Sequence, residues 1–125
     1  MRKEMENRLI NFAVDLFEIS KELSNSFVAT HLTNQILRSS TGAALNFAEA
    51  QSAESRKDFI HKSSIVLKEL RETNVNLRII MRMNICKDSS RINQAMLESE
   101  ELVAIFYKSI ETAKKNGLEI RKKHE

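Results

Sequence analysis

Apolar residues recur along four segments of this chain at alternating spacings of four and three residues. In the first segment the row is Met5, Leu9, Phe12, Leu16 and Ile19. Such a row lies on one side of an α-helix, which has about 3.6 residues per turn, and it is typical of helices that pack into bundles. The sequence has no proline and only two glycines, so little interrupts long helices. The pattern therefore predicts an all-α fold.

Short polar interruptions separate the four segments and carry residues that commonly cap helices. These candidates are Thr30, Ser55 with Asp58, and Asp88 or Ser89. Asn116 and Gly117 form a C-terminal stop signal. We predict a single domain over residues 1–117 and a short basic tail at 118–125, with helices near 3–24, 31–51, 56–85 and 89–115. Because the links are short, we expect an antiparallel, up-down-up-down four-helix bundle.

The segment from Gln35 to Ala50 is rich in small residues and carries a polar stripe. Small side chains let neighbouring helices approach closely, and polar groups between helices need hydrogen-bond partners. We interpret Arg38, Asn46 and Glu49, joined by Glu69 of the third helix, as a structural polar network that fixes the helix register. The alternative is that Glu49 and Glu69 are paired carboxylates for acid–base catalysis or metal binding.

The residue patterns of a catalytic or cofactor site are incomplete in this chain. A di-metal site in a helix bundle uses two Glu-x-x-His pairs, whereas Asp58 with His61 is the one comparable acidic pair. Cys86 has no histidine near it in sequence, and Gly42 and Gly117 are too isolated for a phosphate-binding loop. We therefore predict that the protein is not an enzyme and binds no cofactor or metal.

The N-terminal residues and the single cysteine indicate the cellular compartment. No apolar stretch follows the basic residues at the start, and no run approaches the roughly 18 apolar residues of a membrane span. One cysteine cannot form a disulfide within the chain. We expect a cytoplasmic protein with no membrane partner.

Positive charge concentrates in the third helix, although the net charge is only +3. Arg71, Arg78 and Arg82 are spaced by seven and four residues, so they lie along one stripe. With Lys87 and Arg91 they form a candidate nucleic-acid-binding surface that would contact phosphates. The alternative is that basic residues near a helix C-terminus complement the helix dipole and stay solvated.

Several short motifs resemble a known family. They are Gln35 with Arg38, residues 46–49 (Asn-Phe-Ala-Glu), residues 55–59 (Ser-Arg-Lys-Asp-Phe), and Glu69 with Leu70. In this order they resemble the four-helix-bundle proteins encoded in intervening sequences of bacterial 23S ribosomal RNA genes. The chain departs from that pattern at Leu37, Ala44 and Ala50, where the family commonly has Arg, Pro and Gly.

The resemblance implies an antiparallel bundle that assembles into a ring, commonly a homopentamer, with no established catalytic activity. A similar fold occurs in the accessory protein of diversity-generating retroelements, a pentameric basic barrel proposed to bind nucleic acid. In a ring the arginine stripe would repeat around the axis and produce a dense positive field. Two functions remain open: a homo-oligomer that binds structured RNA or DNA, and a protein-interaction or assembly module.

Overall fold

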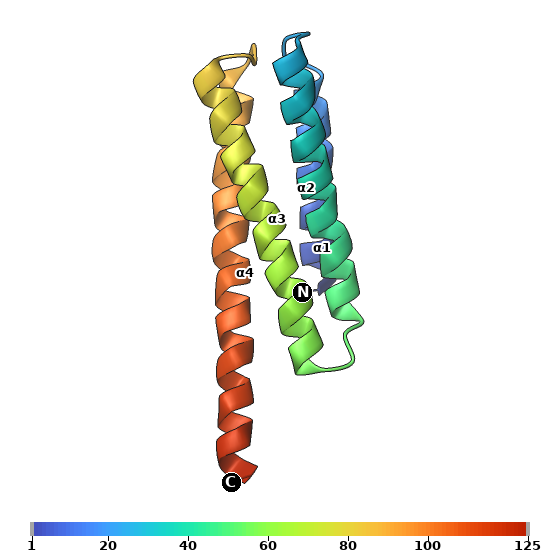
Figure 1. The fold of residues 1–125 in the computed structure, drawn as a ribbon, viewed down its shortest axis with the longest axis vertical. Helices are drawn as coiled ribbons and strands as arrows, with labels where there is room; N and C mark the ends of the chain where they lie inside the picture. Colours follow the sequence, from blue (N-terminus) through green and yellow to red (C-terminus); the bar gives the residue numbers. More distant parts are fainter. Residues whose placement is uncertain (1, 125) are drawn as a thin grey trace.

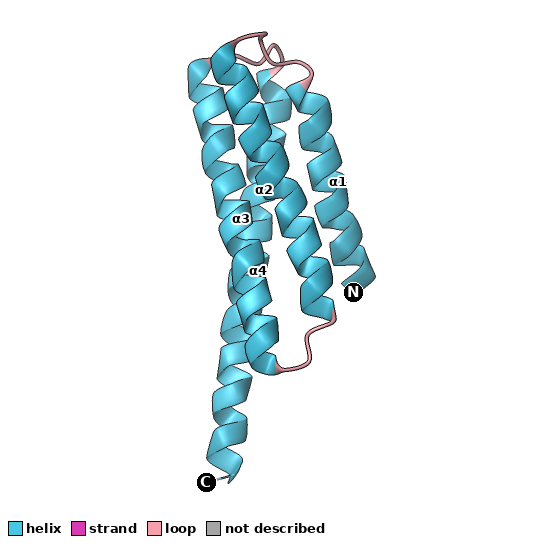
Figure 2. Ribbon diagram, turned by 45° about the vertical axis from the view of Figure 1, so that its right-hand side comes forward, coloured by secondary structure: helices cyan, strands magenta, loops and turns pink. Residues whose placement is uncertain are grey.

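Four long α-helices form the protein in a computed structural model, which describes the backbone of residues 2–124 and the side chains of residues 2–117. The helices are α1 (Arg2–Ser20), α2 (Phe27–Gln51), α3 (Arg56–Met83) and α4 (Ser89–His124). They lie side by side along one long axis (Figure 1; Figure 2). No β-strand occurs in the described backbone. The predicted all-α, four-helix fold is therefore confirmed.

The α1–α2 loop lies beside the α3–α4 loop. The backbone N–H of Ser24 donates to the carbonyl oxygen of Ile85 at 2.9 Å, and Leu23 forms an isolated β-bridge with Cys86. The α2–α3 loop lies at the other end of the molecule (Figure 1). Around the bundle, α2 contacts α1 and α3, and α4 contacts α3 and, least extensively, α1. The α1–α4 border is therefore the thinnest part of the helix packing.

The predicted apolar rows form the core. The largest fully buried apolar side chains among the described residues are Leu9, Leu16, Ile36, Val66, Leu70, Leu77, Ile80, Ile92 and Leu102. Phe47 of α2 and Phe106 of α4 meet edge to face, with ring centroids 5.6 Å apart. Burying one large apolar side chain contributes about 1.5–3 kcal/mol, so these rows supply most of the stability.

Small and hydroxyl-bearing residues fill the contact between α2 and α3. Ser39 and Ala43 are fully buried there. The Ser39 and Thr73 hydroxyl oxygens are 2.6 Å apart, and the Thr73 hydroxyl donates to the Glu69 carbonyl at 2.9 Å. The two hydroxyls share one hydrogen bond across the helix contact. Paired hydroxyls therefore fix the α2–α3 register with small side chains.

The structure corrects one predicted helix start and confirms another. Thr30 does not cap α2, because the Ser26 hydroxyl accepts from the Ala29 N–H at 3.1 Å and starts the helix earlier. The Ser26 side chain satisfies one of the free N–H groups of the first turn. The Ser26 backbone is extended, as is usual for the residue that caps a helix N-terminus. Ser55 caps α3 as predicted, accepting from the Asp58 N–H at 3.0 Å.

Helix α4 does not end at Asn116 and Gly117, as the sequence predicted, but continues to His124. It extends beyond the other helices (Figure 1). Glycine in a helix interior costs only about 1 kcal/mol relative to alanine, and no proline follows it. The missing side chain also makes room for Arg56 of α3: a Cβ at Gly117 would lie 3.2 Å from the Arg56 Cδ. Residues 118–124 of the predicted tail are therefore helical in their backbone, and residue 125 lies outside the described residues.

Candidate nucleic-acid interface

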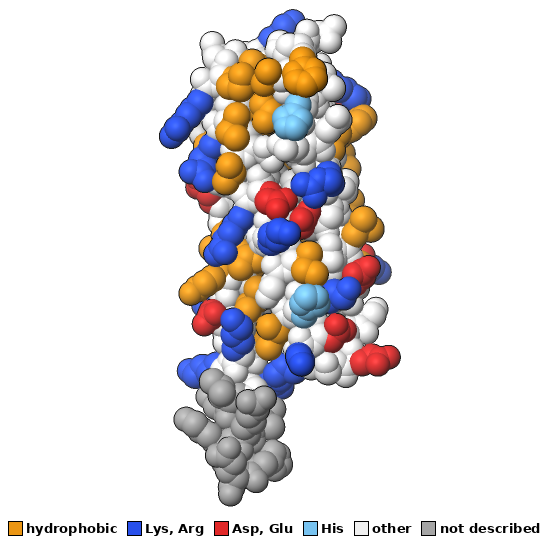
Figure 3. Space-filling view, viewed as in Figure 1, with side chains coloured by type: hydrophobic (Ala, Val, Ile, Leu, Met, Phe, Trp, Pro, Cys, Tyr) orange, Lys and Arg blue, Asp and Glu red, His pale blue; other side chains and the backbone are white. Residues whose placement is uncertain are grey.

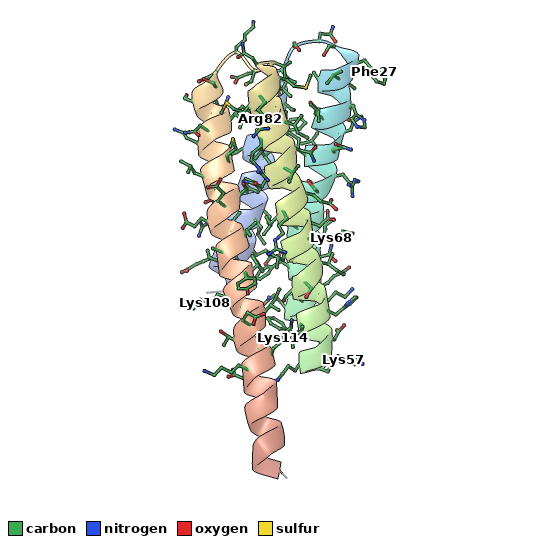
Figure 4. All side chains as sticks on the ribbon, turned by 60° about the vertical axis from the view of Figure 1, so that its left-hand side comes forward. Phe27, Lys57, Lys68, Arg82, Lys108 and Lys114 are labelled. Atoms are coloured by element: carbon green, nitrogen blue, oxygen red, sulfur yellow. The ribbon has the colours of Figure 1, made fainter. Side chains whose placement is uncertain are left out.

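Helix α3 carries a row of basic side chains along its outer side. The row consists of Lys57, Lys68, Arg71, Arg78 and Arg82, which we call the α3 basic face; all five are exposed. At 100° per residue they fall within an arc of about 80°. Figure 4 marks Lys57, Lys68 and Arg82 along the helix, and Figure 3 shows basic and hydrophobic side chains interspersed over the molecular face that α3 crosses. The sequence predicted the arginines as site residues but not Lys57 and Lys68, which the same helical period places beside them.

The arginines of this face have no acidic partner among the side chains the structure describes. In residues 2–117 no carboxylate lies within 4.0 Å of the Arg71, Arg78 or Arg82 guanidinium. Each group can therefore offer its N–H donors to a ligand, and the planar guanidinium matches the geometry of phosphate.

Lys87 and Arg91 do not continue the row. Lys87 is exposed in the α3–α4 loop. Arg91 lies on the first turn of α4, where its Nη1 donates to Glu22 Oε1 at 2.9 Å. The loop resets the helical phase, so proximity in sequence did not place Arg91 on the same side as Arg82. Arg91 instead joins α4 to the turn that follows α1, and its guanidinium is partly occupied.

The predicted polar network of Arg38, Asn46, Glu49 and Glu69 does not form as a unit. Arg38 lies 3.5 Å from Glu72 Oε2, Asn46 donates to the Gly42 carbonyl at 2.8 Å, and Glu49 accepts from Lys62 at 2.9 Å. The stripe places these side chains on one side of α2, but each is long or polar enough to reach a nearer partner. Glu49 and Glu69 are also not paired carboxylates. Glu49 of α2 binds Lys62, whereas Glu69 of α3 packs against Gly42, which precedes Glu49 by seven residues along α2.

Glu69 is a buried carboxylate at the α2–α3 contact. It is 8% exposed, and a Cβ at position 42 would lie 2.6 Å from its Oε2, so Gly42 provides the space that it occupies. Burial raises the pKa of Glu69, and the nearby Glu72 raises it further, while Arg38 and Lys68 oppose these effects. Glu69 is thus part of the helix contact, and its burial disfavours the charged form of the carboxylate.

Two neighbouring depressions lie along the outer side of α3. The larger, of about 770 Å³, is lined by residues of α2, α3 and α4 that include Lys68, Arg71, Tyr107 and Lys114. The smaller, of about 360 Å³, lies between α3 and α4 and also includes Arg71, together with Arg78. Tyr107 and Lys114 were not predicted as site residues, because the sequence alone does not place them beside the α3 arginines. Knowing that α4 borders α3 was needed to find them.

On the other side of α4, where it borders α1, an arginine is paired with carboxylates of the protein itself. Arg8 of α1 donates through Nε and Nη2 to the two Glu98 oxygens at 2.9 and 2.7 Å, and its Nη2 lies 3.0 Å from Glu101 Oε1. These bonds, those to Glu98 first, raise the pKa of Arg8. This guanidinium is already occupied by carboxylates and ties α1 to α4.

Several hydrophobic side chains remain exposed outside the basic face. Ile10, Val14 and Phe17 form a row on α1, and Phe27 at the start of α2 is 88% exposed. Figure 4 shows Phe27 at the same end of the molecule as Arg82. Such side chains on a small protein are suited to contact with another chain.

Metal sites and membrane spans are two further features that bear on function. No group of three or more His, Cys, Asp or Glu residues there has the arrangement of a metal site. No helix among the described residues is long and apolar enough to cross a membrane.

Comparison with known proteins identifies the family. The chain matches the 23S rRNA-intervening sequence protein family over residues 3–108. It is similar to the crystal structure of a protein with unknown function from the S23 ribosomal protein family of Bacteroides thetaiotaomicron, with 32% sequence identity and a TM-score of 0.74. That match covers 84% of this chain and 96% of the other. No curated protein matches the sequence. The chain therefore belongs to the 23S rRNA-intervening sequence protein family.

Proposed function

We propose that this protein is a non-catalytic, homo-oligomeric protein that binds structured RNA or DNA through the α3 basic face. The observation that carries the proposal is the absence of carboxylate partners around Arg71, Arg78 and Arg82 among the described side chains. Unpaired guanidinium groups in one row can replace the counterions of successive phosphates, which favours binding at low salt with little sequence preference. A cytoplasmic location accords with this role.

The oligomer in this proposal is a ring of antiparallel bundles, and the family resemblance favours a pentamer. The exposed row of Ile10, Val14 and Phe17 supports self-association, because a second copy would remove it from water. In a ring the α3 basic face would be repeated, and the mild charge of one chain would become a strong local field. Solution mass tests this part directly, and a monomer would remove the argument from repeated charge.

Paired charge reversals test the phosphate contacts. Arg78→Glu with Arg82→Glu should weaken binding to a structured RNA strongly, measured by fluorescence anisotropy at low salt. Lys3→Glu with Lys21→Glu makes the same change in net charge at exposed positions of α1 and the turn after it, and should have a much smaller effect. Equal losses from the two variants would show that net charge alone governs binding, and retained affinity in the first would contradict the proposal.

A protein-interaction or assembly module is the second candidate, and the 88% exposure of Phe27 favours it. In that case the protein would bind no nucleic acid at moderate salt and would retain a defined protein partner in a pull-down. Phe27→Ser should abolish the retention of that partner, because the phenyl ring is the most exposed of the large hydrophobic side chains described.

A further inference from the structure

Tyr107 is an aromatic side chain at the surface that the fold does not require. It is 53% exposed on α4, next to the buried Phe106, which supplies the aromatic contact of the core with Phe47. No cation of the described side chains lies over its ring, since the one cation–π contact among them joins Lys21 to Phe17. Tyr107 thus has an accessible ring face.

The surroundings of Tyr107 combine an apolar floor with positive charge. It borders the depression of about 770 Å³, to which Leu67 and Ile110 contribute largely buried side chains. Arg71 of the α3 basic face and Lys114 of α4 line the same depression. Figure 4 shows Lys114 on α4 and Lys68 on the neighbouring α3. An aromatic ring with cations beside it is the combination that binds unpaired bases and their phosphates.

We propose that this α3–α4 border binds an unpaired nucleotide, with the base stacked on Tyr107 and the adjoining phosphates on Arg71 and Lys114. The inference rests on the proposed function, because it uses Arg71 in the middle of the α3 basic face. In a duplex the base faces are covered by their neighbours, so a duplex can engage the cations but not the Tyr107 ring. The protein should therefore favour single-stranded or bulged segments over a continuous duplex.

The acidic groups near this position do not block it. Glu111 lines the depression, and its carboxylate lies 4.0 Å from Lys114 Nζ in an exposed pair within one helix. Such a pair is held weakly and is screened by salt, so a phosphate can compete for the lysine. Glu72 is engaged by Arg38 on the α2 side. Glu100 lines the smaller depression and not the one that Tyr107 borders.

The composition of the chain provides a direct probe. Tyr107 is the single tyrosine and there is no tryptophan, so tyrosine emission reports on this ring alone. The test titrates the full-length protein with oligothymidylate, with an abasic strand of equal length, and with a blunt duplex. Stacking predicts that oligothymidylate quenches the emission, whereas the abasic strand and the duplex bind without quenching it.

Substitutions separate this inference from the proposed function. Tyr107→Leu should weaken oligothymidylate binding by about 10-fold and leave duplex binding unchanged, while Tyr107→Phe should retain both. Arg71→Glu should weaken all three ligands. If every ligand binds with equal affinity in wild type and Tyr107→Leu, and the emission does not change, the stacking site is wrong although phosphate binding stands. If none of the ligands binds the folded protein at low salt, the proposed function fails and this inference fails with it.

Discussion

The two borders of α4 use arginine in opposite ways. On the α1 side, Arg8 and Arg91 each reach a carboxylate across the border, at distances of 2.7 and 2.9 Å. On the α3 side, Arg71 and Arg78 point to depressions and have no such partner among the described residues. The same residue type therefore joins helices on one border and stays available for a ligand on the other.

The difference follows from how much packing each border has. The α1–α4 contact is the least extensive in the bundle, so ion pairs supplement it. The α3–α4 contact is extensive, and Asn74 of α3 also donates to the Ser99 hydroxyl of α4 at 2.8 Å. Because packing already holds α3 to α4, its arginines are not needed to hold the fold. Unpaired charge on a well-packed border is thus a better indicator of function than charge alone.

The largest expected effect is the loss of nucleic-acid affinity on reversing Arg71, Arg78 and Arg82 together to glutamate. Replacing three phosphate contacts by repulsion should lower affinity at low salt by about 100-fold or more. The free energy of unfolding should change by less than about 0.5 kcal/mol, because these side chains are exposed and have no carboxylate partner within residues 2–117. Anisotropy and urea unfolding measure the two quantities. Unfolding of the variant at far lower urea would show that the arginines hold the fold and would break the comparison.

At the α1–α4 border, Arg8→Met should lower stability and leave nucleic-acid binding intact, the opposite of the effect expected for the α3 arginines. It removes the two hydrogen bonds to Glu98 and leaves carboxylates without their partner, at a cost of about 1–2 kcal/mol in unfolding free energy. Affinity for nucleic acid should be nearly unchanged. Lys21→Met is the control, since its ion pair with Glu18 at 3.4 Å is exposed and should contribute little. A similar stability for the two variants would contradict the assigned role of Arg8.

Arg91 sharpens the comparison because the sequence placed it in the binding surface and the structure places it in an ion pair. Arg91→Met should cost about 1 kcal/mol, since the buried Glu22 Oε2 already has no hydrogen-bond partner and the change leaves the whole carboxylate unpaired. It should weaken nucleic-acid binding less than Arg78→Met does. The reverse order of affinities would restore Arg91 to the binding surface.

The smallest effect concerns the pH dependence of stability at Glu69. Its pKa is raised in the folded protein, so folding favours the protonated form. The stabilisation is complete below the pKa of the unfolded chain and is lost as the pH rises through the folded pKa. Glu69→Gln should therefore reduce the fall in melting temperature between acidic and neutral pH. An unchanged pH profile would show that Glu69 is not a source of this dependence.

The sequence predicted the core well and the site incompletely. The four-three spacing identifies the inward side of each helix, and this correctly placed residues such as Leu16 and Leu70 in the core. It does not reveal which helix lies beside which, so Tyr107 could not be associated with Arg71. The phase of a helix also restarts after each loop, which is why Arg91, grouped with the α3 arginines from the sequence, forms an ion pair with Glu22 instead of continuing their row. The sequence also does not show which partner a long side chain contacts. Arg38 pairs with Glu72 and Glu49 pairs with Lys62, so the two do not share one network.

The salt dependence of binding tests the role of the α3 basic face most directly. The affinity of wild type and of Arg78→Glu with Arg82→Glu for one structured RNA would be measured over a range of salt concentrations. If the arginines bind phosphates, the logarithm of the wild-type association constant falls linearly with the logarithm of salt concentration. The variant should show a slope shallower by about 1 for each lost contact. Equal slopes, or no binding by the folded wild type at low salt, would contradict the role assigned to these arginines.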